Sequence, residues 1–271
     1  MSHAARPPKP KHLGPDYGSQ WQDAAMARAY PCRPPYPPAA YKILLSLLAD
    51  EAPPTILDVG AGTGDLAREL ALHVERVDAV EPSPAMIDVG KSLGGAKLGN
   101  LRWIESPIES APLDGPYGLA VAGESIHWTN WDLAFPRLAE VLAPGAVLAL
   151  VGRHEARLPW SDSLGLLIAR YSTNRDYTPY DIEEELVSRG HFEVLGRART
   201  DDVTFTQSRD EYVDALHSRN GFSRTRMGVA TKVFDAKFRD LLLSHGVQES
   251  VELTTWTELV WGRPLASQGA P

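Results

Sequence analysis

The chain has 271 residues, of which 43% are hydrophobic and 23% are charged, and its formal net charge at pH 7 is −8. This composition excludes collagen-like and disordered classes, and the single cysteine, Cys32, excludes a disulfide framework and fits a reducing compartment. The acidic balance argues against nucleic acid or an anionic membrane surface as the main partner. The N-terminus lacks the apolar stretch of a signal peptide and no apolar run is long enough to span a bilayer, so we expect a cytoplasmic protein.

Two segments of different composition precede the first predicted strand. Residues 1–16 are polar and rich in proline and basic side chains, which predicts a flexible tail. In residues 17–53 a cluster of prolines forbids one continuous helix, and apolar residues at helical spacing predict a helix over 39–49. The aromatic residues of this second segment, which could stack on a ligand or pack onto the core, are Tyr17, Trp21, Tyr30 and Tyr36.

From residue 54 the hydrophobic pattern alternates between strands and helices, as is typical of a parallel sheet with crossover helices. Strands are predicted over residues 55–59, 77–80, 101–104, 119–121, 146–151, 203–206 and 251–261. Helices are predicted over residues 66–72, from Pro84 onward, and over 134–142, 163–171, 182–189, 210–217 and 234–243. We therefore predict an α/β fold with a mostly parallel sheet of seven strands and helices on both faces.

Three glycines follow the first predicted strand at alternate positions in the sequence ILDVGAGTGD: Gly60, Gly62 and Gly64. Glycine is needed where the backbone turns tightly and a ligand approaches closely, and a structural turn accounts less readily for three glycines than for one or two. A dinucleotide-binding fingerprint would have its third glycine at position 65, where this chain has aspartate. Asp65 would place a negative charge where a pyrophosphate meets a helix N-terminus, so we expect a cofactor without phosphates.

Glu81 ends the second predicted strand, about 20 residues after the glycine loop, where a carboxylate can accept hydrogen bonds from both hydroxyls of a ribose. A solvated glutamate in a turn is the alternative for Glu81 taken alone. The spacing from the glycine loop favours the ribose.

These residues resemble the class I S-adenosylmethionine-dependent methyltransferases. The first motif of that family is similar to ILDVGAGTG, its acidic residue after the second strand to Glu81, and its later motif to LAPGAVLAL. The resemblance covers residues 54–152. Three segments resemble the trans-aconitate and related small-molecule methyltransferases: ESIHW, which lies within that range, and RPPYP and SRNG, which lie outside it.

The resemblance implies that S-adenosylmethionine is the cofactor and that Glu81 holds its ribose. The other residues that it implies around the cofactor are Asp58, Gly60, Ala61, Gly62, Thr63, Gly64, Pro82, Met86, Pro107, Ile108, Glu109, Gly123, Glu124 and Ser125. Arg33 is our candidate for binding the methionine carboxylate, with a surface arginine as the alternative, and Tyr30 of the same segment is a further cofactor contact. A sulfonium cation favours carboxylates, carbonyls and aromatic faces as neighbours.

Residues that follow the fourth and fifth strands are expected to bound the methyl-transfer site, because ligands bind beyond the carboxyl ends of the strands of such a sheet. These residues are His127, Trp128 and His154. His127 could act as a general base or could only pack against Trp128, and an ionised carboxylate acceptor would need no base. A basic stretch containing Arg219, Arg224 and Arg226 could contact an acidic substrate or could form a solvated loop. We predict no metal site.

The expected activity is transfer of a methyl group to a small-molecule acceptor, with oxygen favoured over nitrogen or carbon. The alternatives are a quinone-type C-methyltransferase, a dinucleotide-dependent oxidoreductase, and a non-catalytic binding protein with the same fold. The predicted organisation is a flexible tail (1–16), N-terminal lid helices (17–53), the cofactor-binding core (54–152), a substrate cap (153–250), a final sheet strand (251–263) and a tail (264–271).

Overall fold

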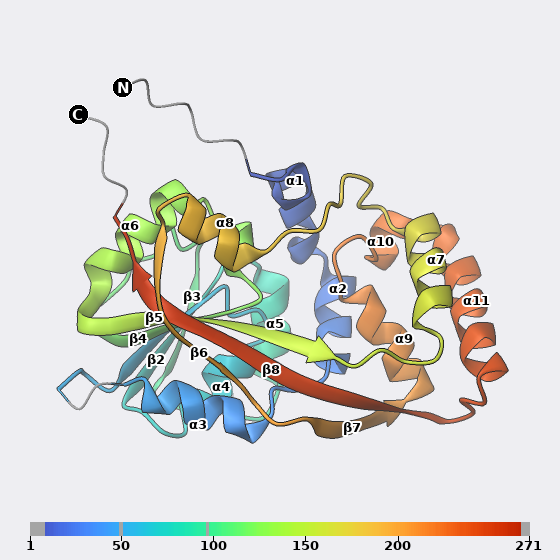
Figure 1. Cartoon of the computed structure of the whole chain (residues 1–271), viewed down its shortest axis with the longest axis horizontal. Helices are drawn as coiled ribbons and strands as arrows, with labels where there is room; N and C mark the ends of the chain where they lie inside the picture. Colours follow the sequence, from blue (N-terminus) through green and yellow to red (C-terminus); the bar gives the residue numbers. More distant parts are fainter. Residues whose placement is uncertain (1–8, 49–50, 96–97, 267–271) are drawn as a thin grey trace.

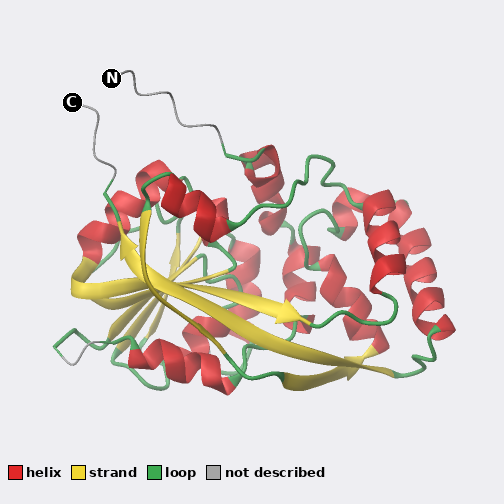
Figure 2. Cartoon of the chain, in the orientation of Figure 1, coloured by secondary structure: helices red, strands yellow, loops and turns green. Residues whose placement is uncertain are grey.

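A β-sheet forms the centre of the molecule, and helices cover both of its faces (Figures 1 and 2). The computed structural model describes residues 9–48, 51–95 and 98–266. Within these residues the sheet has eight strands in the order β3-β2-β1-β4-β5-β8-β6, and β7 also pairs with β8. The strands are β1 (Thr55–Val59), β2 (Arg76–Glu81), β3 (Leu101–Glu105), β4 (Tyr117–Gly123), β5 (Leu142–Glu155), β6 (Phe192–Arg199), β7 (Val203–Ser208) and β8 (Ser250–Pro264).

Strands β1 to β5 run parallel to one another, and β8 runs antiparallel to β5, β6 and β7. Because β8 is 15 residues long, β6 pairs with its later part and β7 with its earlier part. This arrangement confirms the predicted α/β class with a mostly parallel sheet. The strand order reverses between β1 and β4, which is where ligands bind in open α/β sheets.

The sheet contains one strand more than the seven predicted, since the sequence analysis does not predict β6. The pairing of β6 with β8 shifts register between Val194 and Gly196. Exposed and less exposed residues alternate along β6, but the apolar Leu195 is 46% exposed and Gly196 takes a less exposed position, so the apolar–polar pattern of the sequence is lost at these two residues. A Cβ atom on Gly196 would lie 2.4 Å from the ring of Trp261, so glycine is required there by packing. Glycine inside a short apolar run obscures the strand pattern.

Consecutive residues of β1 point to opposite faces of the sheet and are covered by different helices. On one face Ile56 packs with α3 (Pro38–Ser46) and α4 (Asp65–Leu70). On the other face Leu57 packs with α6 (Trp131–Val141) and α8 (Ile182–Ser188). A further helix, α5 (Pro84–Ser92), follows β2 and contacts β2 and β3.

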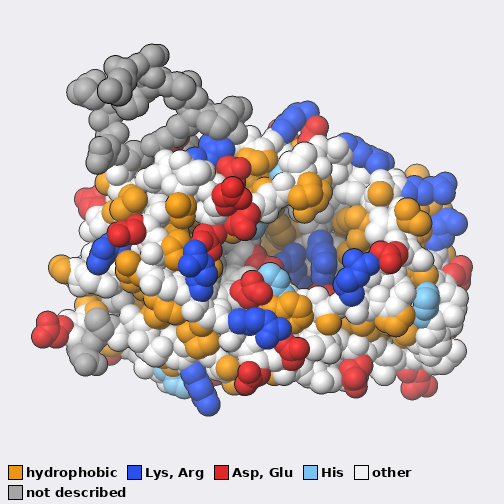
Figure 3. Space-filling model, in the orientation of Figure 1, with side chains coloured by type: hydrophobic (Ala, Val, Ile, Leu, Met, Phe, Trp, Pro, Cys, Tyr) orange, Lys and Arg blue, Asp and Glu red, His pale blue; other side chains and the backbone are white. Residues whose placement is uncertain are grey.

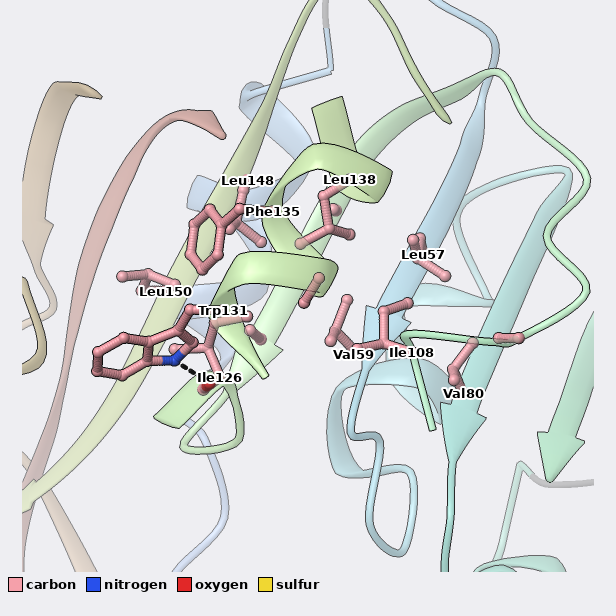
Figure 4. Close-up of a cluster of buried hydrophobic side chains, with 14 of the residues drawn as sticks. Leu57, Val59, Val80, Ile108, Ile126, Trp131, Phe135, Leu138, Leu148 and Leu150 are labelled. Atoms are coloured by element: carbon pink, nitrogen blue, oxygen red, sulfur yellow. Dashed lines mark hydrogen bonds between the residues drawn. The ribbon is translucent and has the colours of Figure 1, made fainter. Parts of the chain in front are cut away.

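The buried cluster on the α6 face joins that helix to strands β1 to β6 and to the turn after β4, and Figure 4 shows part of it. Trp131, Ala134, Phe135 and Leu138 are buried at helical spacing, so α6 begins at Trp131, three residues before the predicted start, and continues through Pro136. The indole Nε1–H of Trp131 donates a hydrogen bond to the carbonyl of Ile126 at 2.8 Å. Strand β5 then begins at Leu142, and Pro144 and Gly145 lie inside it at a register shift instead of preceding it as predicted.

A separate helical lobe lies beside the sheet and has a core of its own. Its helices are α7 (Ser161–Tyr171), α9 (Arg209–His217), α10 (Arg224–Met227) and α11 (Ala230–Ser244). Phe234 and Phe238 are fully buried at its centre. The predicted cap, 153–250, is therefore divided, because α8 and β6 pack on the sheet. Figure 3 shows that the surface is hollowed between the sheet and this lobe, with basic and apolar side chains inside the hollow.

The N-terminal segment corrects one prediction. Residues 9–16, expected within a flexible tail, are held against the protein: His12 and Leu13 are buried, and Lys9 hydrogen-bonds to carbonyls beyond β4. The segment continues through short helices, which are η1 (Lys11–Leu13), α1 (Pro15–Gly18), η2 (Ser19–Gln22), α2 (Ala24–Ala29) and η3 (Tyr30–Cys32). Residues 1–8 and 267–271 of the predicted tails lie outside the described residues. None of the described helices combines the length and the apolar character that a bilayer span requires.

Truncation of Phe135 should destabilise the fold strongly, because its ring is fully buried between α6 and the sheet. We expect Phe135→Ala to lower the free energy of unfolding by about 3–5 kcal/mol, measured by urea denaturation. Leu133→Ala on the same helix is the control, since Leu133 is 57% exposed, and should change that free energy by no more than about 0.5 kcal/mol. Equal effects of the two substitutions would contradict this account of the core.

Candidate functional site

A cavity of about 1370 Å³ lies at the carboxyl ends of β1, β2 and β4, between the sheet and the N-terminal segment. Its volume exceeds the ~300–1,000 Å³ of a typical small-molecule site, so it has room for more than one ligand. The residues predicted to contact a cofactor that line this cavity are Tyr30, Gly60, Gly62, Glu81, Pro82, Met86, Pro107, Ile108, Glu109, Gly123, Glu124 and Ser125. The structure therefore brings together residues from five separate parts of the sequence.

The glycine loop after β1 is left-handed at each of its three glycines, with φ values of 67° at Gly60, 57° at Gly62 and 78° at Gly64. A Cβ atom on Gly60 would lie 2.6 Å from Cβ of Ser125, and one on Gly64 would lie 2.6 Å from the ring of Trp103. At Gly62 the nearest atoms to such a Cβ belong to the Tyr30 ring, 3.7 Å away. Gly60 and Gly64 are thus required by packing as well as by conformation, whereas Gly62 faces the cavity.

Glu81 at the end of β2 connects this loop to the next strand. Its Oε2 atom accepts a hydrogen bond from the N–H of Gly62 at 2.8 Å, and Oε1 accepts one from the N–H of Ser83 at 2.9 Å. The side chain lines the cavity, and its burial raises the pKa of the carboxyl to about 7. A carboxylate in this position can exchange backbone partners for ligand hydroxyls without leaving the cavity wall.

Four predicted cofactor contacts lie behind the cavity wall: Asp58, Ala61, Thr63 and Gly64. Asp58 is buried and its Oδ2 atom accepts a hydrogen bond from the N–H of Ala67 at 3.1 Å, which holds α4 against β1. Burial raises the pKa of Asp58 to about 8. The fully buried Thr63 donates through Oγ1 to Asp65. These residues position the loop and do not themselves face the cavity.

Arg33, the candidate for the methionine carboxylate, does not line the cavity. Its Nε atom donates to Oγ of Ser218 at 2.8 Å, and Nη1 lies 3.3 Å from Oε2 of Glu124. The guanidinium stacks on the ring of Tyr30, with 4.3 Å from Cζ to the ring centroid. Tyr30 itself lines the cavity, so Arg33 contacts the tyrosine and does not reach the cavity.

The three residues predicted to bound the methyl-transfer site are placed differently. Trp128 lines the cavity, and its ring lies 4.9 Å from that of His127. Burial lowers the pKa of His127 to about 4, so its imidazole is neutral and weakly basic at neutral pH. His154 does not line the cavity, which corrects its assignment: it pairs across strands with Trp256 and stacks on that ring at 5.6 Å. The pairing directs His154 toward β8.

Three arginines considered for an acidic substrate already have partners in the protein. Arg219 is paired with Glu155, Arg224 with Asp214, and Arg226 donates to the carbonyl of Asp16 and to Ser19. Of the three, Arg226 alone lines the cavity among the described residues. The part of the chain that the structure describes contains no cluster of three or more His, Cys, Asp or Glu side chains that could hold a metal ion.

Comparison with known proteins identifies the family. Residues 56–145 match the family described as Methyltransferase domain. An uncharacterized methyltransferase of Mycobacterium tuberculosis is 31% identical over 215 residues, which cover 79% of this chain and 82% of that protein. The chain belongs to the class I S-adenosylmethionine-dependent methyltransferases. Membership identifies it as a methyltransferase and removes the oxidoreductase alternative.

Two further similarities extend beyond the matched domain. The malonyl-[acyl-carrier protein] O-methyltransferase of Pseudescherichia vulneris is 27% identical over 227 residues, covering 81% of this chain and 85% of that protein. A solved methyltransferase structure from Anaeromyxobacter dehalogenans superimposes with a TM-score of 0.61 at 26% identity, covering 85% of this chain and 97% of that one. Both similarities thus cover most of this methyltransferase and not only residues 56–145.

The cavity of the methyltransferase includes residues that the sequence analysis does not identify. Lys9 donates from Nζ to the carbonyls of His127 and Thr129, each at 2.8 Å, and burial lowers its pKa to about 8. Asp176 accepts hydrogen bonds from Lys11 at 2.9 Å and from the hydroxyl of Tyr17 at 2.8 Å. These contacts join residues more than 100 positions apart, so no local sequence pattern indicates them.

The raised pKa of Asp58 predicts a pH dependence of stability. Because the folded carboxyl keeps its proton to a higher pH than the unfolded one, Asp58 makes the fold less stable as pH rises from about 4 to about 8. Asparagine can still accept the Ala67 hydrogen bond but does not titrate. We expect Asp58→Asn to have a higher free energy of unfolding than the parent. The difference between the two should increase by about 1 kcal/mol or more from about pH 5 to pH 8.

Urea denaturation at several pH values measures this margin. The control is Asp88→Asn, which removes an exposed carboxyl on α5. A constant difference between parent and Asp58→Asn across the pH range would show that Asp58 is ionised in the folded state and would contradict the prediction.

Proposed function

We propose that this methyltransferase binds the ribose of S-adenosylmethionine at Glu81 and its methionine moiety over Gly60 and Gly62, and methylates an oxygen of a small-molecule acceptor. The observation that carries the proposal is the hydrogen bond between Glu81 and the N–H of Gly62 at the wall of one large cavity. The residues fit the cofactor, because Gly60, Gly62 and Glu81 line the same cavity and neither glycine carries a side chain that would fill it.

The adenine would lie between apolar side chains at the ends of β2 and β3. Met86 and Ile108 are buried and both line the cavity, with Pro82 and Pro107 beside them. Glu109 is held in place because its Oε1 atom accepts a hydrogen bond from the N–H of Asn130. This placement supports the adenine assignment for the segment 107–109.

The methionine end would face Tyr30, with Arg33 as a positioning residue behind it. S-adenosylmethionine supplies an electrophilic methyl group attached to a sulfonium. The residues of this chain orient the reactants and exclude water, and positioning of this kind supplies most of the rate in an in-line methyl transfer. The low pKa of His127 disfavours it as a general base, so we assign it a packing role against Trp128.

Methylation at oxygen is supported by the similarity to an O-methyltransferase over most of both chains. The segments that resemble trans-aconitate and related methyltransferases support a small-molecule acceptor. The proposal is tested by incubating the enzyme with S-adenosylmethionine carrying an isotopically labelled methyl group and a metabolite extract, and by locating the label in the product by NMR. A label on nitrogen or carbon would overturn the oxygen assignment.

Removal of the Glu81 carboxylate should weaken cofactor binding. We expect Glu81→Ala to lower the affinity for S-adenosylhomocysteine by about 1–3 kcal/mol, the usual contribution of hydrogen bonds to a charged group, measured by calorimetry. Glu105→Ala is the control, because Glu105 is the exposed cross-strand partner of Glu81 on β3. An affinity as high in Glu81→Ala as in the parent would remove Glu81 from the ribose site.

A Cβ atom at Gly62 should block the cofactor without preventing folding. We expect Gly62→Ala to lower S-adenosylhomocysteine affinity by about tenfold or more, because the added atom would occupy space that the ligand approaches. The control is Gly246→Ala, since Gly246 is also left-handed, with φ 83°, and has nothing within 4 Å of the added Cβ. Both variants place an alanine at a left-handed φ, so similar losses of affinity in the two would contradict the loop assignment.

A further inference from the structure

Glu124 lies where β4 ends and the chain turns across the glycine loop. Its φ of 51° makes it the only non-glycine with a positive φ among the described residues. Left-handed conformation is unfavourable for a glutamate, and residues held in it cluster at functional sites.

Hydrogen bonds on both sides of Glu124 hold this turn in place. Gly123 is paired with Val151 in the sheet, and the N–H of Glu124 donates to the carbonyl of Val151 at 3.0 Å. On the other side, Oγ of Ser125 donates to the carbonyl of Val59. The backbone is thus fixed at β5 and at β1, and the Glu124 side chain is left at the cavity wall next to the glycine loop.

The carboxylate of Glu124 is incompletely satisfied within the protein. It is 30% exposed, and its Oε2 atom lies 3.3 Å from Nη1 of Arg33, longer than the ~2.7–2.9 Å of a strong charge-assisted hydrogen bond. Arg33 directs its Nε atom to Ser218 instead. Among the described residues no hydrogen bond reaches Oε1 of Glu124, so the carboxylate can accept one from a ligand.

The arginines near Glu124 do not line the cavity. Arg33 and Arg153 are both absent from its lining; Arg153 is bonded to Asp65 at 2.8 Å and lies over the ring of Tyr36. His127 is neutral at neutral pH because burial lowers its pKa to about 4. Lys9 does line the cavity, but its ammonium is hydrogen-bonded to the carbonyls of His127 and Thr129. The Glu124 carboxylate thus lies at the cavity wall with the aromatic rings of Tyr30 and Trp128 and without a strong ion pair.

We propose that Glu124 accepts a hydrogen bond from the methyl acceptor, in place of the cofactor contact that the family resemblance implies, and selects acceptors that carry a hydroxyl or an ammonium group over acceptors that carry a carboxylate. The proposal rests on the proposed function, since it takes the cofactor to lie over the adjacent glycine loop. An acceptor carboxylate at the same place would bring two negative charges together in a partly buried site, which is unfavourable.

The first experiment separates this role from contact with the methionine ammonium of the cofactor. S-adenosylhomocysteine and 5′-methylthioadenosine differ in the amino-acid moiety, which the second lacks. We expect Glu124→Gln to bind each of them by calorimetry within about twofold of the parent. A loss of S-adenosylhomocysteine affinity with unchanged 5′-methylthioadenosine affinity would assign Glu124 to the cofactor and overturn the proposal.

The second experiment measures selectivity with three probes that share a benzyl group: 2-phenylethylamine, 2-phenylethanol and phenylacetate. With the enzyme saturated with S-adenosylhomocysteine, we expect the amine and the alcohol to bind the parent about fivefold or more tightly than phenylacetate, and this ratio to fall below about twofold in Glu124→Gln, as measured by ligand-observed NMR. Equal binding of the three probes by the parent, absence of binding by all three, or an unchanged ratio in the variant would overturn the proposal.

Two further variants complete the design. Glu124→Gly removes the carboxylate and the backbone strain together, so it should unfold at a temperature no lower than the parent does and still lose the selectivity. Asp16→Asn removes another carboxylate from the cavity lining and should keep the selectivity. If Asp16→Asn also loses the selectivity, the net charge of the cavity determines it, which would contradict a specific role for Glu124. A parent protein that binds no S-adenosylhomocysteine would instead overturn the proposed function.

Discussion

The carboxylate of Glu81 joins the loop after β1 to the start of α5 by accepting the N–H groups of Gly62 and Ser83. The bond to Gly62 holds the left-handed loop against the end of β2. The loop can pack this closely because a Cβ on Gly60 or Gly64 would clash with Ser125 or Trp103, and neither residue has one. Burial of the carboxylate raises its pKa to about 7, which shows that keeping it at the cavity wall costs solvation free energy. Together with the bonds from the N–H groups of Gly60 and Ala61 to the carbonyl of Val80, this side chain fixes the loop at the cavity floor.

The N-terminal segment encloses the cavity by hydrogen-bonding to both the sheet and the helical lobe. Toward the sheet, Lys9 bonds to the turn after β4 and the carbonyl of Trp21 accepts from Ser83. Toward the lobe, Oε1 of Gln20 accepts from the N–H of Gly221. Because the segment bridges both parts, its short helices form the roof of the cavity while the strand ends form its floor. A roof of this kind limits water access to the reacting groups.

Local sequence signals predicted the parallel half of the sheet, since a buried strand followed by glycines or prolines is visible within ten to fifteen residues, as at β1. They also indicated that the glycine loop and Glu81 lie together, as they do at the cavity wall, because both belong to a short strand–loop–helix–strand unit. Contacts between distant parts of the chain were not accessible in this way: Lys9 lies in a segment whose composition predicts a tail, and β6 is interrupted by Gly196. His154 was misplaced because its cross-strand partner, Trp256, lies about a hundred residues away along the chain.

The central claim is that the cofactor lies between the glycine loop and Glu81. A crystal structure of the enzyme with S-adenosylhomocysteine tests it most directly. The account predicts that both ribose hydroxyls lie within hydrogen-bonding distance of the Glu81 carboxylate and that the homocysteine moiety passes over Gly60 and Gly62. A nucleoside bound elsewhere in the cavity, with Glu81 still bonded only to the backbone of Gly62 and Ser83, would contradict it.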